Sequence, residues 1–463
     1  MKILALCGSM RSKAENSPFI RELVNSSSNL DDYIERVKSF DDKKRRLCNS
    51  EILAGAGLCG AKNSGAKIRY YPLIDLFPRK DKKIYEFKGP SEFKEAFFMD
   101  TLDVKKDQLS ELLEAIARAD GIILSTPVYF GDRSSVANKL LQITGIRGLL
   151  KNKIFGIMSV GAKRNGGQET ANIYSLFEAL KQDALIVGNG PPTSQYGGTA
   201  VAGDMGQILE DRWGLETAFG TGARVAQVAG IFREGRRSRA IDKVKILILI
   251  TIDTHDRLLK NYLEKIIEKV GQELPWVEFE MIELIRGTIY RCLGCSKCPV
   301  LISGKEGEDK TRHGCVIKDP SDFMEMVRDA LNNCNGALVA GLNIHQSEEM
   351  IFRYQVFIER MRFMRRNHFE LTNLLVSGLC YNQTGAIVNP IHSLKTVTSF
   401  IRHNTIIHRP VEIIEHKGEV IKTGEDEFVR FCKSANRLAA GRLMVPQVEA
   451  LYQAQGEGGY KIF

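Results

Sequence analysis

Four of the ten cysteines are clustered in the second half of the chain. Cys292, Cys295 and Cys298 form a C-x2-C-x2-C run, and Cys315 follows after sixteen residues. A 4Fe-4S cluster needs four thiolates at the corners of a cube, and one short loop with this spacing can supply three of them. Four thiolates also make closed zinc sites. The spacing favours a cluster with Cys315 as the fourth ligand and His313 outside the ligand set, while zinc and the absence of metal stay open.

Three polar loops in the first half carry a different chemistry. Residues 8–18 (GSMRSKAENSP) combine hydroxyls, the charge of Arg11 and a helix predicted to begin at Ser17, which suits a phosphate monoester. The dinucleotide motif G-x-G-x-x-G is absent, so FMN fits this loop better than NAD or FAD. Residues 125–135 (STPVYFGDRSS) and 161–170 (GAKRNGGQET) offer apolar walls and glycines that let the backbone approach a flat ring. Together the loops predict an FMN site.

The elements that must position these residues follow from the apolar pattern. Short apolar runs alternate with amphipathic stretches, which is typical of a parallel sheet with helices on both faces. Ligands of such sheets bind beyond the carboxyl ends of the strands, where the three loops lie. The predicted strands are 2–8, 66–74, 121–127, 153–161, 184–190, 244–250, 277–284, 336–342, 373–380 and 409–416. The helices predicted in the first half are 17–27, 107–119, 134–145, 168–183 and 213–228.

The order of elements in the first half repeats in the second. The fold class predicted is therefore α/β, with two tandem flavodoxin-like domains that each have a doubly wound, five-stranded parallel sheet. The domains are expected at 1–235 and 243–443, joined through the basic segment 231–243 and followed by a tail at 444–463. Residues 30–65 break the rhythm and are interpreted as a mobile surface insertion in the first domain.

The first half resembles the NADPH-dependent FMN reductase and iron-sulfur flavoprotein family. The family has a GSxR phosphate loop, an SPVYFG-like turn and a glycine-rich GGQE-type loop in this order, and the resemblance covers most of residues 1–230. Thr126 stands where the family more often has a small residue, and the phosphate loop is slightly longer. The resemblance implies that the FMN phosphate is held by Ser9, Arg11, Ser12 and Ser17 and that the ring is framed by Pro127, Val128, Tyr129, Phe130, Gly131, Gly161, Arg164, Gly166, Gly167 and Gln168.

The cysteine segment is similar to the same family. Its members have a C-x2-C-x2-C run, a nearby fourth cysteine and an apolar-Ile-Lys-Asp start of the next helix, which residues 316–319 match. The spacer at 299–314 is longer than in the family. The resemblance implies a 4Fe-4S cluster as a second cofactor.

The second half lacks the flavin signals of the first. Asp253 and Asp256 in its first loop would repel a phosphate, and residues 341–346 replace the proline-aromatic turn. We therefore expect flavin in the first domain alone and cysteine chemistry in the second. In the family the cluster of one subunit is associated with the flavin of its dimer partner, so the resemblance implies a pseudo-dimer within one chain.

Composition restricts the classes of function. Hydrophobic residues make up 43% and charged residues 26% of the 463 residues, as in ordinary globular proteins, and a net charge of +9 is too modest to favour nucleic acid as a partner. No apolar run is long enough to span a bilayer or to act as a signal peptide, so a cytoplasmic location without a membrane partner is expected. Thiols stay reduced there, which favours metal or redox chemistry over disulfides.

The predicted function is an oxidoreductase in which FMN accepts a hydride from NAD(P)H and passes electrons to the cluster and to an unknown acceptor, which could be a protein. No side chain is assigned as a catalytic acid or base. Two alternatives stay open: an electron carrier fed by ferredoxin that serves a partner enzyme, and a flavin or quinone reductase whose cysteines are structural. Residues 348–369 form a basic amphipathic stretch. We interpret it as a helix whose apolar side faces the core, in preference to a helix that binds a partner. The sequence leaves homo-oligomerisation and the choice between NADH and NADPH open.

Overall fold

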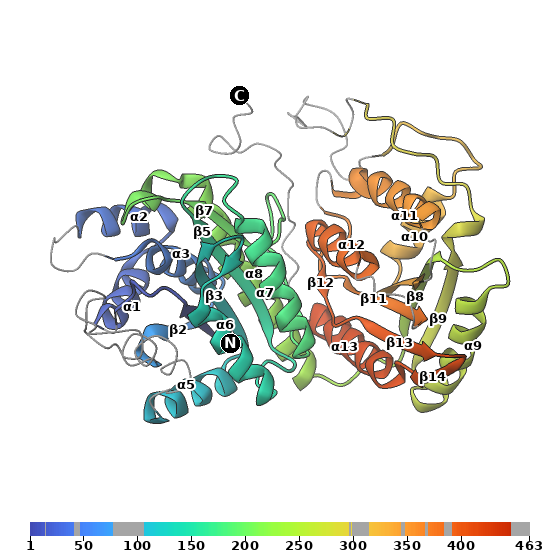
Figure 1. Cartoon of the computed structure of the whole chain (residues 1–463), viewed down its shortest axis with the longest axis horizontal. Coiled ribbons are helices and arrows are strands. Elements are labelled where there is room, and N and C mark those ends of the chain that lie inside the picture. The colour runs from blue at the N-terminus through green and yellow to red at the C-terminus, as the bar shows by residue number, and fades with distance from the viewer. Residues whose placement is uncertain are drawn as a thin grey trace, which may run out of the picture. The chain divides into compact units, whose positions relative to one another are not determined.

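The chain is divided into two compact units. The first contains Met1–Ala184 and Gly197–Gln227, and the second contains Leu185–Tyr196 and Val228–Phe463. In each unit a mostly parallel sheet is covered by helices, as the alternating pattern predicted (Figure 1). The computed structural model describes residues 1–13, 15–40, 47–76, 106–295, 298, 314–343, 348–365, 369–383 and 391–445.

The sheet of the first unit has parallel strands in the order β2–β1–β3–β5–β7. Taken along the chain this order is 2-1-3-4-5, which is the flavodoxin-like order. Every residue of β5 is buried, so both faces of the sheet are covered. The strands are β1 (Lys2–Cys7), β2 (Lys67–Pro72), β3 (Gly121–Tyr129), β5 (Ile154–Gly161) and β7 (Gly198–Val201).

Helices α3 and α8 share one face of this sheet and touch through glycines. A Cβ atom on Gly222 of α8 would lie 1.6 Å from the carbonyl oxygen of Gly57 in α3, so the two backbones are in direct contact. Right-handed crossovers place α5, α6 and α7 on the other face. The helices are α1 (Asn16–Ser26), α2 (Leu30–Ser39), α3 (Asn49–Asn63), α5 (Lys106–Arg118), α6 (Ser135–Ile146), α7 (Gln168–Lys181) and α8 (Arg212–Arg237).

The surface position predicted for residues 30–65 is wrong for the part that forms α3. This segment holds α2 and α3, and α3 is buried from Ser50 to Ala61 against β1, β3 and β5. Its sequence, NSEILAGAGLCGAKN, is small and apolar on all sides because the helix is enclosed on all sides, so it lacks the amphipathic period by which a surface helix is recognised.

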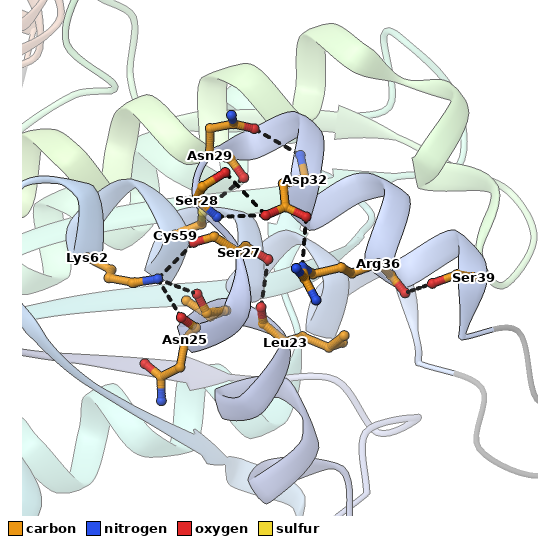
Figure 2. A network of polar contacts seen from close by, with 11 residues as sticks. Leu23, Asn25, Ser27, Ser28, Asn29, Asp32, Arg36, Ser39, Cys59 and Lys62 are labelled. Atoms are coloured by element: carbon orange, nitrogen blue, oxygen red, sulfur yellow. Dashed lines mark hydrogen bonds and ion pairs between the residues drawn. The ribbon is translucent and has the colours of Figure 1, made fainter.

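Polar contacts fix the turn between α1 and α2 (Figure 2). The Lys62 Nζ atom donates to the carbonyl oxygens of Val24, Asn25 and Ser27 at 2.7–3.1 Å, which satisfies the carbonyl end of α1. The Asn29 side chain accepts from the Asp32 backbone N–H at 2.9 Å and caps α2. The connection is therefore part of the packed domain.

The predicted strand 184–190 also differs from the structure. It yields only β6 (Leu185–Ile186), which belongs to the second unit and pairs antiparallel with β12 (Ile406–Ile407). Strand β7 pairs parallel with β5 over Met158–Gly161. Gly197 and Gly198 let the β7 backbone approach closely, since a Cβ atom on Gly197 would lie 2.2 Å from the Ile157 carbonyl oxygen. Because glycines add nothing to an apolar run, the pattern did not reveal this strand.

The second unit repeats the same strand order as β9–β8–β10–β11–β13. The duplication itself stays a prediction. The strands are β8 (Val244–Ile252), β9 (Val277–Glu283), β10 (Gly336–Asn343), β11 (Leu375–Gln383) and β13 (Val411–His416), with β14 (Glu419–Lys422) antiparallel to β13. The helices that follow α8 are α9 (Leu258–Glu273), α10 (Met324–Asn332), α11 (Glu348–Arg360), α12 (Ile391–Phe400) and α13 (Glu425–Met444).

Two predicted segments of the second half can be compared with the helices. Helix α8 continues to Arg237 with Phe232 buried, so the first part of the predicted join is helical. Helix α11 buries Tyr354 and Phe357, which confirms the core-facing interpretation of that stretch. Among the described residues no helix has the length and apolar character needed to cross a bilayer. The charged run 41–46, the spacer 299–313 with His313, residues 344–346 and the tail from 446 lie outside the described residues.

Candidate functional site

The first loop of the site connects β1 to α1. The Ser12 hydroxyl is buried and donates to the Ser9 carbonyl oxygen at 2.7 Å, while the Arg11 backbone N–H donates to the Ser9 hydroxyl at 3.1 Å. The Arg11 side chain is exposed, and its guanidinium has no hydrogen-bond or ion-pair partner among the described residues. The loop therefore holds itself in a tight turn, and of its described residues Arg11 is an exposed cation without a partner.

The predicted helix start at Ser17 is one residue late. Helix α1 begins at Asn16 with Glu15 as its N-cap residue, and the Ser17 hydroxyl donates to the Tyr70 carbonyl oxygen of β2 at 3.3 Å. Ser17 thus joins the loop to the sheet. Its predicted contact with a phosphate stays a prediction.

A buried carboxylate is hydrogen-bonded to this loop. Glu51 of α3 is fully buried and accepts hydrogen bonds from Lys13 N at 3.1 Å, from Asn16 Nδ2 at 3.1 Å and from Cys48 N at 2.8 Å. Burial raises the pKa of Glu51, and the hydrogen bonds from Cys48, Lys13 and Asn16 oppose that shift. Glu51 was not predicted from the sequence. Its signal was a capping box at the start of α3, concealed because the N-cap is a cysteine.

Three thiols of the first unit are buried. Cys7, Cys48 and Cys59 are all inside the protein. A hydrogen bond with the Cys7 thiol, reinforced by burial, raises the pKa of Cys48 well above its usual value. Burial raises the pKa of Cys59 to about 11. Cys48 and Cys59 are therefore protonated and poorly nucleophilic at neutral pH.

The second loop is a tight hairpin. Strand β3 pairs with β4 (Asp132–Arg133), and the two residues between them, Phe130 and Gly131, have φ angles of 52° and 79°. Two successive positive φ angles fit the type I′ turn of a two-residue hairpin. Phe130 is fully exposed at the tip, and Tyr129 is 53% exposed. Both aromatic rings are thus available to contact another molecule.

The third loop, between β5 and α7, is shaped by Gln168. The buried Gln168 amide donates to the carbonyl oxygens of Lys163 at 2.7 Å and Ala200 at 3.2 Å and accepts from the Gly166 N–H at 3.0 Å. Two of these bonds stay within the loop and the third joins it to β7, so Gln168 fixes both the shape of the loop and its place beside β7. Arg164 is exposed on its outer side.

Short contacts join the three loops at the carboxyl edge of the sheet. The Gly8 N–H donates to the Ser125 carbonyl oxygen at 2.8 Å, and the Ser134 hydroxyl donates to the Gly8 carbonyl oxygen. A Cβ atom on Gly167 would lie 2.5 Å from the Gly131 Cα atom, so the hairpin and the third loop touch backbone to backbone. A free cation at one end and apolar rings with close backbone at the other fit a phosphate-bearing flat ring such as FMN.

The four predicted metal ligands line one cavity in the second unit. Cys292, Cys295, Cys298 and Cys315 share this cavity with Arg360 and other residues of α11 and the turn that follows it. Soft thiolates in this number suit iron-sulfur clusters or zinc. Within the described ranges, no three ligating side chains stand at the distances that would hold a metal ion. The four thiols therefore line one cavity but do not stand at the distances of metal ligands.

In the second unit a side chain of the chain itself occupies the N-terminus of α9. The buried Asp253 carboxylate accepts from Leu259 N at 2.8 Å and from Lys260 N at 3.0 Å at the start of α9. In an anion site of this kind the same N–H groups would bind a phosphate. This contact supports the expectation that the second unit does not bind FMN through its first loop.

Comparison with known proteins agrees with this geometry. The model of the NADPH-dependent FMN reductase family matches residues 1–190. An iron-sulfur flavoprotein of Methanocaldococcus jannaschii is 41% identical over 133 residues, which cover 28% of this chain and 68% of that protein. The chain belongs to the NADPH-dependent FMN reductase and iron-sulfur flavoprotein family. As a member of this family it is a flavin-dependent oxidoreductase.

Further proteins are similar to this chain. An iron-sulfur flavoprotein of Methanosarcina thermophila is 30% identical, and the match covers 43% of this chain and 98% of that protein. An NAD(P)H dehydrogenase (quinone) of Aromatoleum aromaticum is 27% identical over 38% of this chain and 88% of that protein. Among solved structures, a flavone reductase is 18% identical with a TM-score of 0.30, and the match covers 50% of this chain and 63% of that one.

Proposed function

We propose that the chain is an NAD(P)H-dependent FMN oxidoreductase that passes electrons through a 4Fe-4S cluster to a further acceptor. The observation that carries the proposal is the convergence of all four motif cysteines on one cavity in a chain whose other unit joins three flavin-type loops. We also propose that the two units are tandem flavodoxin-like domains that act as a cytoplasmic pseudo-dimer.

The residues of the first unit would bind and orient the flavin. Arg11 would neutralise the phosphate, with Ser9 and the loop backbone around it and Glu51 holding that loop in place. The β3–β4 hairpin and the third loop would shield the ring from water, because Tyr129 and Phe130 extend from the hairpin tip. When bound, FMN supplies the chemistry that couples the two-electron donor NAD(P)H to one-electron acceptors.

The cysteines would hold the second cofactor. Cys292, Cys295 and Cys298 would contribute three thiolates from one loop and Cys315 the fourth, which is the donor set of a 4Fe-4S cluster. Such a cluster supplies one-electron transfer. The acceptor is proposed to be a small molecule or a protein.

A flavin or quinone reductase without a cluster is the second candidate. It is favoured by the lack of finished metal geometry among the described residues and by the family relatives that are NAD(P)H dehydrogenases (quinone). In that case the cysteines would serve the fold alone.

Anaerobic purification of the full chain separates these candidates. We expect an absorption spectrum with both flavin and cluster bands, together with iron and sulfide in equal amounts and little zinc. The Cys295→Ser variant should lose iron and keep FMN, whereas Cys334→Ser, which changes a buried cysteine outside the cavity, should keep both. Flavin without iron in the wild-type chain would favour the second candidate. Loaded protein that oxidises neither NADH nor NADPH would indicate an electron carrier.

A further inference from the structure

A single buried guanidinium joins the parts of the cysteine region. Arg360, the last residue of α11, is 2% exposed and lines the cysteine cavity. Its Nη1 atom donates to the Tyr290 carbonyl oxygen, and its Nη2 atom donates to Asp322 Oδ2 at 2.6 Å. Asp322 Oδ1 in turn accepts from Tyr290 N at 3.4 Å and from Met324 N at 3.3 Å. One ion pair thus ties the end of α11 to the start of α10 and to the cysteine loop.

The partners of Arg360 lie beside the ligands in the sequence. Tyr290 comes two residues before Cys292, and Asp322 lies a few residues after Cys315. A backbone hydrogen bond also joins the same two segments, because Phe323 N donates to the Thr288 carbonyl oxygen at 2.9 Å. The ion pair therefore positions the segment before Cys292 relative to the segment after Cys315, although the two segments are separated in the sequence.

The energetics of this ion pair favour a positioning role over a stabilising one. The side chains of Arg360 and Asp322 are 1% and 2% exposed, so both charges have lost their hydration. Buried pairs of this kind often stabilise a fold no better than apolar residues of equal volume, and in some proteins they select one arrangement of the chain. The fixed arrangement here is that of the loop before Cys292.

A second arginine faces the same cavity with a free charge. Arg362 lines the cavity and is exposed, and no hydrogen bond or ion pair to its guanidinium is found among the described residues. A 4Fe-4S cluster on four thiolates carries a net negative charge, and nearby charge is one of the factors that set its reduction potential. An unpaired cation beside four cysteines is placed to compensate such a charge.

We propose that Arg360 is the positioning residue for the cysteine centre and that Arg362 supplies its counter-charge. The inference rests on the proposed function, because it requires that the four cysteines hold an anionic cluster. It adds two residues that act on the cluster without being its ligands.

The positioning role is tested by matched isosteric changes in the full chain. Asp322→Asn breaks the Arg360 pair, and Glu370→Gln breaks the pair between Arg328 and Glu370, which is buried in the same unit but does not line the cavity. After anaerobic reconstitution with ferrous iron and sulfide, Asp322→Asn should retain less than half of the wild-type iron and sulfide per chain. Glu370→Gln should retain the wild-type amount, and both should keep FMN. Arg360→Lys, which keeps the charge but cannot bridge both partners, should repeat the loss if Asp322→Asn does not fold.

The counter-charge role has a separate readout. Arg362→Gln should leave the iron content unchanged and shift the cluster reduction potential to more negative values in a titration followed by electron paramagnetic resonance. Arg353→Gln, a change on α11 outside the cysteine cavity, should leave the potential unchanged.

The outcomes distinguish this inference from the proposed function. A wild-type chain that takes up no iron and sulfide refutes the proposed function and the inference with it. A loaded wild-type chain beside an equally loaded Asp322→Asn variant refutes the positioning role alone. An unchanged potential in Arg362→Gln refutes the counter-charge role.

Discussion

Replacing Glu51 by glutamine tests whether the phosphate loop is held by the buried carboxylate beneath it. The change preserves shape but replaces one of the two acceptor oxygens by an NH2 donor. Because one oxygen accepts from Lys13 N and the other from Cys48 N, with Asn16 Nδ2 bonded to both, either the buried Cys48 N–H or the half-buried Lys13 N–H loses its acceptor. An unsatisfied buried donor costs about 1–3 kcal/mol.

The loss should appear in two measurements. Unfolding by urea should show a first unit less stable by about 1–3 kcal/mol. If the whole loss falls on the order of the loop, FMN should bind roughly 5- to 150-fold more weakly, since about 1.4 kcal/mol corresponds to a tenfold change in Kd. Glu35→Gln is the matched control, because Glu35 is an exposed residue of α2 that forms an ion pair with Lys38. Its FMN affinity should match that of the wild type.

The pH dependence supplies the sign of the effect. The pKa of Glu51 is raised in the folded chain above its ordinary value of 4.5, so the folded state favours the protonated form. The stability that this group contributes is therefore fully present below about pH 4.5 and declines as the pH rises through the raised pKa. The stability difference between wild type and Glu51→Gln should shrink as the pH increases. A variant with unchanged FMN affinity and stability, or a difference that grows with pH, would refute the reasoning.

Two further predictions concern backbone contacts. Gly167→Ala should destabilise the first unit by about 1–3 kcal/mol and lower its FMN content, because the residue has a φ of 94° and its new Cβ atom would meet Gly131. Gly148→Ala is the control: its φ is 61° and it faces open space, so it should show the backbone strain alone. Equal flavin content in the two variants would contradict the role of the contact with Gly131. Asp253→Ala should destabilise the second unit by about 1–2 kcal/mol in urea unfolding, because it removes the cap of α9, while Asp256→Ala should have little effect. FMN bound per chain should stay at one, and an increase to two in Asp253→Ala would show that this carboxylate alone excludes the phosphate.

The central strands were predictable from the sequence because they are buried on both faces. Residues 121–127 and 153–161 are continuous apolar runs, and the structure places them as the neighbouring strands β3 and β5. The loops after β1, β3 and β5 followed from the same reasoning, since parallel strands bring their carboxyl ends to one edge.

The parts that the sequence concealed depend on small residues and on distant partners. Strand β7 and helix α3 are rich in glycine and alanine, so neither gives a strong apolar period. Glu51 and Arg360 contact residues that are far away in the sequence, and no local spacing identifies such partners. The side-chain roles of Ser12 and Gln168 were equally hidden, because both side chains bond to backbone carbonyl groups, Ser12 in its own loop and Gln168 in its own loop and in β7.

The path of the chain between its two units has a practical consequence for anyone who wishes to study the flavin half alone. Residues Leu185–Tyr196 belong to the second unit although Gly197–Gln227 return to the first. Within the second unit, Ser194 donates to the Ile401 carbonyl oxygen at 3.0 Å and accepts from Asn404 N at 3.1 Å. No single cut yields both halves whole. A fragment ending near residue 235 would still contain residues 185–196 but would lack the β12 strand with which β6 pairs. The exposed edge of β6 would then be a site for aggregation and proteolysis. To separate the halves, residues 185–196 should therefore be replaced by a short polar linker.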